Sequence, residues 1–196
     1  VSIINNLNNN YEIIDVHGKK INANKIVLAA GVYLEKILKL LDINIKIKCF
    51  PQQLIVTERM PELLKTVITV AHGKLSLKQF ENGTVLIGGG WPGKGNIENG
   101  YNETIPENLI GNMRLACHAI PNLKNSRVSR VWVGLEAETD DAMPIIGELP
   151  NLKNAFIIGS IHSGYTSGPY MGKLLSEKIL GKDVDLSLFD IRRLIN

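Results

Sequence analysis

The hydrophobic pattern near the N-terminus changes from a buried strand to an amphipathic helix. Residues 26–30 form a continuous apolar run that ends at Gly31, which is typical of a strand buried on both faces of a mostly parallel sheet. The apolar residues that follow are spaced as on one face of a helix: Leu34, Ile37, Leu38 and Leu41. The order of strand, glycine and helix predicts half of a nucleotide-binding α/β unit.

The middle of the chain has a pattern typical of antiparallel strands. Residues 43–57 alternate between apolar and polar and predict a strand that is broken at Pro51. Asn82-Gly83 separates two further strand-like segments and predicts a hairpin with a type I′ turn. Pro106 is expected to open a helix, and its apolar stripe is formed by Leu109, Ile110, Met113, Ala116, Cys117 and Ile120. An antiparallel sheet with one covering helix is an α+β arrangement, so this part is expected to be an insert between two α/β segments.

The last third returns to an α/β pattern. Strands are expected at residues 127–134 and 155–159, with a short buried segment at 144–147. A glycine-rich turn at residues 163–169 then leads into an amphipathic helix that ends at Gly181. Glycines let a backbone approach a ligand, and a helix N-terminus attracts anions, so this turn is a candidate binding element. It fits equally a capped helix start that binds nothing.

The composition excludes several classes of function. Of the 196 residues 44% are apolar and 21% are charged, an ordinary balance for a globular protein, and the net charge of +3 comes from scattered lysines. We therefore expect no nucleic-acid partner and no membrane span, because no apolar run approaches the roughly 20 residues required. The N-terminus does not resemble a signal peptide, so a cytoplasmic location is expected. Cys49 and Cys117 have no second ligand at metal-binding spacing and are expected to be thiols.

Several short motifs occur in an order that is more specific than any one of them. They are Ala29-Ala30-Gly31, residues 51–58 and 85–90, Trp132-Val133-Gly134-Leu135, Thr139 with Asp141 and Pro144, Ile146-Gly147, and Gly159 followed by residues 162–166 and Gly168-Pro169. Together they resemble the C-terminal half of the FAD-dependent D-amino-acid oxidase-like family, most nearly its branch of glycine oxidases and sarcosine or proline dehydrogenase β-subunits.

The resemblance implies a fold and a set of cofactor contacts. Residues 1–43 and 126–196 would form the C-terminal part of a Rossmann-like FAD-binding domain, and residues 44–125 an inserted substrate domain with an antiparallel sheet. The residues implied to bind FAD are Ala30 and Gly31 near its diphosphate or ribose, and Gly147, His162, Ser163, Gly164, Tyr165 and Thr166 against the isoalloxazine ring. The implied activity is oxidation of the C–N bond of an amine or amino acid by hydride transfer to the flavin. This chemistry requires no acid or base side chain from the protein, so no catalytic residue is named.

One departure from the family is the missing dinucleotide fingerprint. Members begin with a strand and a Gly-x-Gly-x-x-Gly turn that holds the diphosphate. In this sequence Gly88-Gly89-Gly90 follows a strand but leads into Trp91-Pro92 rather than a helix. We therefore expect FAD binding to require a missing N-terminal half or a partner subunit.

A second departure concerns the substrate. Glu136 and His162 occupy the two positions at which glycine oxidase-like members would carry arginines that bind the substrate carboxylate. A glutamate reverses that charge, so a cationic or secondary amine or an opine-like compound becomes a better candidate than a simple amino acid. Gln53 and Trp91 complete the set of candidate substrate-binding residues. The alternatives are a surface or ion-paired carboxylate at Glu136, a structural His162 and a Trp91 that only packs at the edge of its domain.

Two other classes of function remain open. A nicotinamide-dependent dehydrogenase would share only the α/β architecture, and both the split layout and the Tyr-Thr-x-Gly-Pro turn favour a flavin enzyme. A non-enzymatic binding module, left after loss of the cofactor, is the other alternative. An adjacent N-terminal half would distinguish it from the enzyme.

Overall fold

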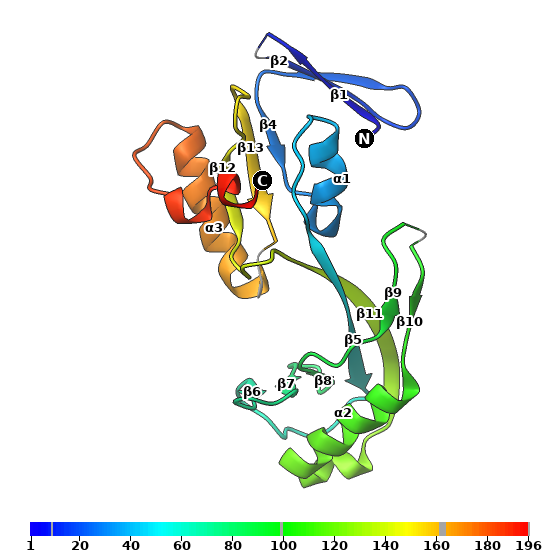
Figure 1. The fold of residues 1–196 in the computed structure, drawn as a ribbon. Coiled ribbons are helices and arrows are strands. Elements are labelled where there is room, and N and C mark those ends of the chain that lie inside the picture. Colours follow the sequence, from blue (N-terminus) through cyan, green and yellow to red (C-terminus); the bar gives the residue numbers. More distant parts are fainter. Residues whose placement is uncertain (9, 99, 161–163, 196) are drawn as a thin grey trace. The chain divides into compact units, whose positions relative to one another are not determined.

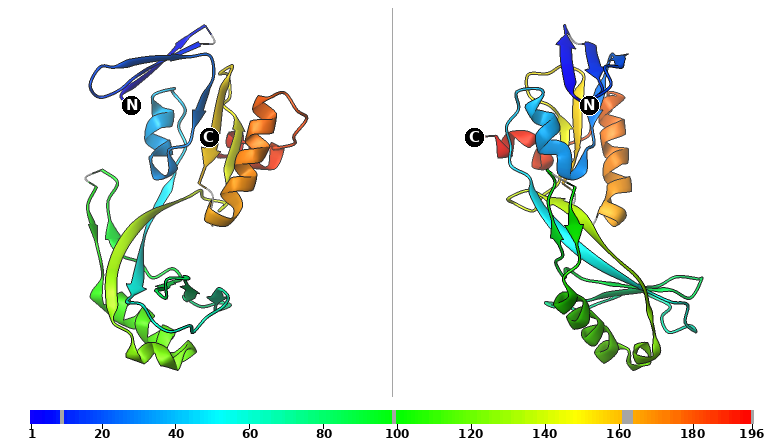
Figure 2. Two further views of the ribbon diagram at one scale, coloured as in Figure 1. Left: turned by 180° about the vertical axis from the view of Figure 1, so that it is seen from behind. Right: turned by 90° about the vertical axis from the view of Figure 1, so that its right-hand side faces the viewer.

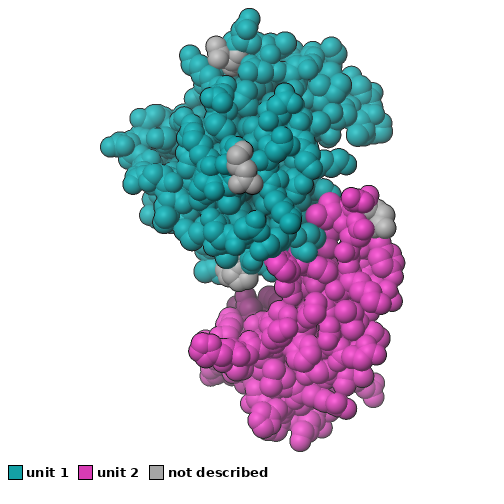
Figure 3. All heavy atoms as spheres, viewed as in Figure 1, with its two compact units in different colours: residues 1–49, 136–196 teal, residues 50–135 magenta. Residues whose placement is uncertain are grey.

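The computed structural model describes residues 1–8, 10–98, 100–160 and 164–195. The chain forms two compact units (Figure 3), one made of Val1–Cys49 with Glu136–Asn196 and the other of Phe50–Leu135. The boundaries fall later than the 43/44 and 125/126 expected from the sequence. The first boundary is later because Ile45 and Ile47 pack into the core of the first unit. The second is later because strand β11 (Val128–Glu138) pairs with β5 (Lys48–Thr57), so most of β11 belongs to the sheet of the second unit.

The described residues of the first unit, called unit 1 below, form two small sheets and two α-helices (Figures 1 and 2). The antiparallel sheet β1-β2-β3 comprises Ile3–Leu7, Asn10–Ile14 and Lys20–Ala23. The second sheet has the order β12-β13-β4 and comprises Ile145–Glu148, Ala155–Gly159 and Ile26–Leu28. The helical elements are η1 (Gly31–Tyr33), α1 (Leu34–Lys39), α3 (Gly164–Ile179), η3 (Ser187–Phe189) and η4 (Ile191–Leu194).

The sheet β12-β13-β4 lies between two apolar layers. Alternate strand residues point to opposite faces, so Ile157 packs with Leu34 and Leu38 of α1, whereas Phe156 packs with Leu175 of α3. The parallel pairing of β13 with β4 confirms the predicted α/β architecture. The expectation that residues 26–30 are buried on both faces is wrong for Val27, which is 46% exposed on the face opposite to that of Ile26 and Leu28.

The second unit, unit 2, is an antiparallel sheet covered by one helix, as the sequence predicts. Its sheet has the order β11-β5-β8-β7-β6, in which β6, β7 and β8 are Ile68–Thr69, Ser76–Gln79 and Val85–Gly88. The remaining elements are β9 (Lys94–Gly95), β10 (Asn102–Glu103), α2 (Pro106–Ala119) and η2 (Pro121–Asn125). Ala116 of α2 and Leu123 of η2 pack onto Ile55, Leu77 and Ile87 of the sheet.

Two details of unit 2 differ from the sequence-based expectations for its strands. Strand β5 continues through Pro51, whose carbonyl oxygen still accepts a hydrogen bond from the Gly93 amide at 2.9 Å. The β7–β8 hairpin is present, but its turn is not type I′, because Gly83 has a positive φ of 89° and Asn82 does not. The bonds from Gly83 N to Phe80 O and from Phe80 N to Thr84 O instead define a longer loop with glycine at its left-handed position.

The apolar stripe of α2 also differs from its expected composition. Ile110 is 48% exposed, and Asn112 is fully buried, donating from Nδ2 to the Gly88 carbonyl at 3.1 Å. Asn112 was not expected in the interior, because its buried position depends on a carbonyl group of a strand far away in the sequence.

The expected glycine-rich turn before the last helix is largely helical. α3 begins at Gly164, so Pro169 lies inside the helix rather than in its first turn. A proline here removes only one donor, near a helix end whose first residues face solvent. Within the described ranges, no helix has both the length and the apolar character needed to cross a membrane.

Candidate functional site

The candidate site in unit 1 lies where two parallel strands end. Ile26, Val27 and Leu28 of β4 pair in register with residues 155–157 of β13, so both strands run to the same edge of the sheet. Ala30 and Gly31 follow β4 at this edge, and Ser160 and Gly164 follow β13. We call these four residues the carboxyl edge. Open α/β sheets bind their ligands at such an edge, beyond the carboxyl ends of the strands.

The carboxyl edge is shaped by close packing of Leu34 against Gly159. A Cβ atom added to Gly159 would lie 2.1 Å from Leu34 Cδ1, so only glycine leaves room for the fully buried leucine. This contact fixes the start of α1 against the end of β13. The 3-10 helix η1 begins directly after β4, with Ala30 as its N-cap.

Ser160 has the most unusual conformation at the carboxyl edge, and the sequence did not point to it. Its φ is +49°, and it is the buried member of the described non-glycine residues with positive φ. Its side chain is 3% exposed, and its Oγ has no hydrogen-bond partner among the residues that the structure describes. Strained backbone and unsatisfied polar atoms are costly, and both concentrate at functional sites.

The glycines of the expected cofactor site leave open space beside the backbone. An added Cβ would meet no atom within 4 Å at Gly31, Gly147 or Gly164. Gly31 and Gly164 lie at the carboxyl edge and leave room for a large ligand to approach the main chain, which is how FAD is held in α/β domains. The residues present therefore fit the cofactor that the sequence implies.

Gly147 lies in β12, the edge strand on the other side of β13 from β4. It pairs with Ile157 in the middle of β13, is buried and has a φ of +146°. The hollow beside it, about 400 Å³, is lined on its other side by residues that follow α3, including Asp183 and Asp185. Ala30, Gly31 and Gly164 thus follow the two parallel strands, whereas Gly147 lies within β12.

The first turn of α3 completes the described part of the carboxyl edge. Gly164, Tyr165 and Thr166 are exposed, Tyr165 to 92%. The first amide groups of a helix have no partner within it and favour negative charge, so an anionic group could bind there. His162 and Ser163, also expected to contact the flavin, lie outside the described residues.

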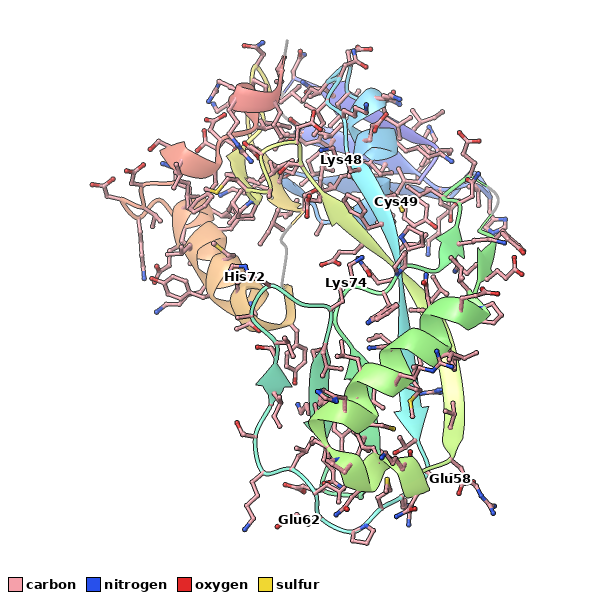
Figure 4. The ribbon with its side chains drawn as sticks, turned by 60° about the horizontal axis from the view of Figure 1, so that its bottom comes forward. Lys48, Cys49, Glu58, Glu62, His72 and Lys74 are labelled. Carbon is pink, nitrogen blue, oxygen red and sulfur yellow. The ribbon has the colours of Figure 1, made fainter. Side chains whose placement is uncertain are left out.

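The two candidate substrate residues of unit 2 have structural partners. The amide of Gln53 is buried and spans the main chain of Ile105, accepting from its nitrogen at 3.0 Å and donating to its oxygen at 3.4 Å. Trp91 donates from Nε1 to the carbonyl of Lys74, which is labelled in Figure 4, at 2.6 Å. Its ring also lies against α2, because a Cβ on Gly111 would come within 2.6 Å of it. These contacts favour packing roles, and a substrate role for either residue stays a prediction.

Glu136 is a half-buried residue of β11 that forms an interaction within the protein. Three residues further on, Thr139 Oγ1 hydrogen-bonds to the Asp141 carboxylate and to the Met143 carbonyl, both at 2.7 Å. The guanidinium of Arg193 lies beside Asp141 and, with these hydrogen bonds, holds the pKa of that carboxyl group far below its usual range. The Thr139–Asp141 motif thus fixes the loop between β11 and β12.

In the described part of the chain, no three His, Cys, Asp or Glu side chains are grouped so that they could hold a metal ion. Cys49 and Cys117 are free thiols.

Comparison with known proteins identifies the family. The family model described as FAD dependent oxidoreductase matches residues 2–178. The chain is 31% identical over 166 residues to the hydrogen cyanide synthase subunit HcnC of Pseudomonas protegens, covering 81% of this chain and 38% of that protein. It is 27% identical over 186 residues to a subunit of opine oxidase from Rhizobium meliloti, covering 92% of this chain and 46% of that protein.

The fold also matches that of a solved flavoenzyme. The structure of glycine oxidase from Geobacillus kaustophilus superimposes with a TM-score of 0.82 at 18% identity, over 100% of this chain and 52% of the other. The chain therefore spans about half the length of the proteins that it matches, or less. The family is FAD-dependent, so FAD is the cofactor that fits the open glycines of the carboxyl edge. The family resemblance inferred from the sequence motifs is confirmed: this chain belongs to the FAD-dependent oxidoreductases of the D-amino-acid oxidase type.

Proposed function

We propose that this chain is the C-terminal part of an FAD-dependent oxidase or dehydrogenase that oxidises the C–N bond of an amine or amino acid. The observation that carries this proposal is the carboxyl edge of unit 1, where parallel strands, open glycines and a helix N-terminus meet. The hydrogen cyanide synthase subunit, the opine oxidase subunit and glycine oxidase, which the chain resembles, are consistent with such an activity.

The residues of the carboxyl edge would bind and orient the cofactor. When bound, FAD supplies the hydride acceptor, so the protein itself has to position the substrate and exclude competing reactions. Ala30 and Gly31 would lie along the diphosphate or ribose. The first turn of α3 would face the ring system, where the positive end of the helix dipole would stabilise negative charge on the reduced cofactor.

Glu136 favours a substrate that is not held through its carboxylate by arginine side chains. It stands where the family resemblance predicts an arginine, and a carboxylate at that position favours a cationic group. A secondary amine or an opine-like compound therefore fits better than glycine. We also propose that the chain acts with the rest of its polypeptide or with a partner subunit, since two of its relatives are named as subunits.

The absorption spectrum of the full-length gene product tests this proposal. Flavin absorption bands are expected at about 370 and 450 nm, and they should bleach when a secondary amine is added without oxygen. Bleaching by the amine without added NAD⁺, together with no NADH formation when NAD⁺ is supplied, would exclude the nicotinamide alternative. A colourless protein that cannot be reconstituted with FAD would overturn the proposal and favour the non-enzymatic binding module.

A further inference from the structure

The outer face of α2 in unit 2 carries an apolar groove that no part of the proposed flavin chemistry uses. The groove has a volume of about 630 Å³ and lies between α2 and Pro121 of η2. Its floor is formed by Leu109, Ile110, Met113 and Cys117, which repeat at the spacing of one helix face. Leu109, Met113 and Cys117 are partly buried residues at the margin of the core, whereas Ile110 is 48% exposed.

The side chains around this α2 groove have one sign of charge. Arg114, His118 and Lys124 line it, and all three are exposed. In the described part of the chain, neither Arg114 nor Lys124 forms an ion pair. The carboxylate of α2 itself, Glu107, lies in the first turn of the helix and does not line the groove.

An apolar floor with a cationic rim selects one kind of occupant. Protein interfaces combine a buried apolar centre with a polar rim, and charge complementarity at the rim determines which partners are accepted. A groove along a helix receives a second amphipathic helix most readily, because the apolar side chains of one fit between those of the other. The rim cations would then require carboxylates beside the apolar stripe of the incoming helix.

We propose that the α2 groove is the docking site for an acidic amphipathic helix of a partner subunit. The apolar side chains of that helix cover Ile110 and Met113, and its carboxylates pair with Arg114 and Lys124. This inference rests on the proposed function only in that it takes the partner to be a subunit of the same oxidoreductase.

Peptide binding to the full-length gene product tests the docking site. Two synthetic helices of roughly 15 residues share leucines at the i, i+3, i+4 and i+7 spacing and carry either glutamates or lysines beside them. The rate at which Cys117 is alkylated, followed by mass spectrometry of the peptide that contains it, reports whether the groove is covered. Cys49, labelled in Figure 4, is an internal reference, because it belongs to unit 1.

The acidic helix should slow alkylation of Cys117 by about fivefold or more at low salt and leave Cys49 unchanged, and salt should weaken this protection. The lysine helix should not protect Cys117. In the double variant Arg114→Glu with Lys124→Glu, the lysine helix should protect Cys117 and the acidic helix should not. A matched control is Arg59→Glu with Arg127→Glu, which changes the charge of unit 2 equally at exposed residues outside the groove and should change nothing.

Equal protection by both helices, no protection by either, or an unchanged preference in the groove variant would each overturn the docking site. The variant Ile110→Ser is a second probe, because an exposed side chain can be exchanged without unfolding the helix, and it should weaken protection about threefold or more. The flavin spectrum recorded on the same samples separates the two proposals. Amine-dependent bleaching without selective protection refutes the docking site alone, whereas selective protection in a protein that never binds FAD refutes the enzyme alone.

Discussion

Arg193 holds the carboxylate of Asp141 from the far end of the chain. Its Nε lies 2.7 Å from Oδ2 and its Nη2 lies 3.3 Å from Oδ1, while Nη2 also donates to the carbonyl groups of Met143 and Pro144. One guanidinium therefore fastens η4 to the loop that leads into β12. Both residues belong to unit 1, so the pair stabilises the unit that carries the carboxyl edge.

This pair predicts an acid-sensitive contribution to stability. The pKa of Asp141 is lower in the folded protein than in the unfolded chain, chiefly because of Arg193. Stability from the pair is therefore fully present above the unfolded pKa and is lost as the pH falls through the folded pKa, in a window below about pH 4. Asp141→Asn should lower the free energy of unfolding by about 1 kcal/mol at pH 7, since the side chains are 38% and 21% exposed and partly screened.

Urea unfolding at several pH values measures this effect. The difference between the wild type and Asp141→Asn should shrink as the solution becomes more acidic, because protonation removes the same charge. Asp183→Asn is the control, an exposed aspartate in the same unit. A difference that is independent of pH would show that Asp141 contributes through neutral hydrogen bonds rather than through its charge.

The contact between Gly159 and Leu34 predicts that a methyl group added at position 159 strongly destabilises the protein. Gly159→Ala would place a carbon 2.1 Å from a fully buried side chain at the end of β13. We expect a loss of stability of about 2 kcal/mol or more from overpacking. Gly172→Ala is the control, because Gly172 lies within α3 with open space around it, and alanine should stabilise the helix by up to about 1 kcal/mol. Equal melting temperatures for the two variants would contradict this close packing.

Two substitutions at Ser160 separate the effect of its left-handed backbone on stability from that of its buried hydroxyl group. Ser160→Ala removes the buried hydroxyl group, while Ser160→Gly also removes the cost of the left-handed backbone. The apo protein should therefore become more stable in the order serine, alanine, glycine, with a total gain of roughly 1 kcal/mol. If the strained conformation serves the cofactor, Ser160→Gly should retain FAD several-fold less well despite its higher melting temperature. An alanine variant less stable than the wild type would show that the hydroxyl group has a partner in the folded protein.

Much of the fold could be predicted because local pattern and tertiary structure agree. The run at residues 26–30, the helix at Leu34 and the hairpin around Gly83 each follow from a short stretch of sequence. The family resemblance added the order of these elements, which no single motif determines. The expectations that were wrong concern features that depend on residues distant in the sequence. Examples are the exposure of Val27 in β4 and the position of β11 in the sheet of unit 2.

The candidate site was predictable in part. Gly31 and Gly164, which the family resemblance implied as cofactor contacts, have open space beside their backbone and stay predicted contacts. Ser160 gave no such signal, since a serine after a strand is ordinary and its strain appears only in the backbone angles. For Gln53 and Trp91, the sequence could not reveal that Ile105 and Lys74 occupy their polar atoms.

Glu136 carries the prediction about the substrate. Glu136→Arg in the FAD-loaded full-length protein would restore the charge that binds a substrate carboxylate, because a guanidinium pairs with carboxylates through two hydrogen bonds. The measured quantity is the ratio of kcat/KM for an N-methyl amino acid to kcat/KM for the same amine without its carboxylate. This ratio should be about tenfold or more higher in Glu136→Arg than in the wild type. Glu136→Gln removes the charge without reversing it and should produce an intermediate ratio. Since Glu136 forms an interaction within the protein, the melting temperature of each variant is measured alongside. A ratio that stays constant across all three proteins, with folding intact, would mean that Glu136 does not face the substrate and that its carboxylate serves only the structure of β11.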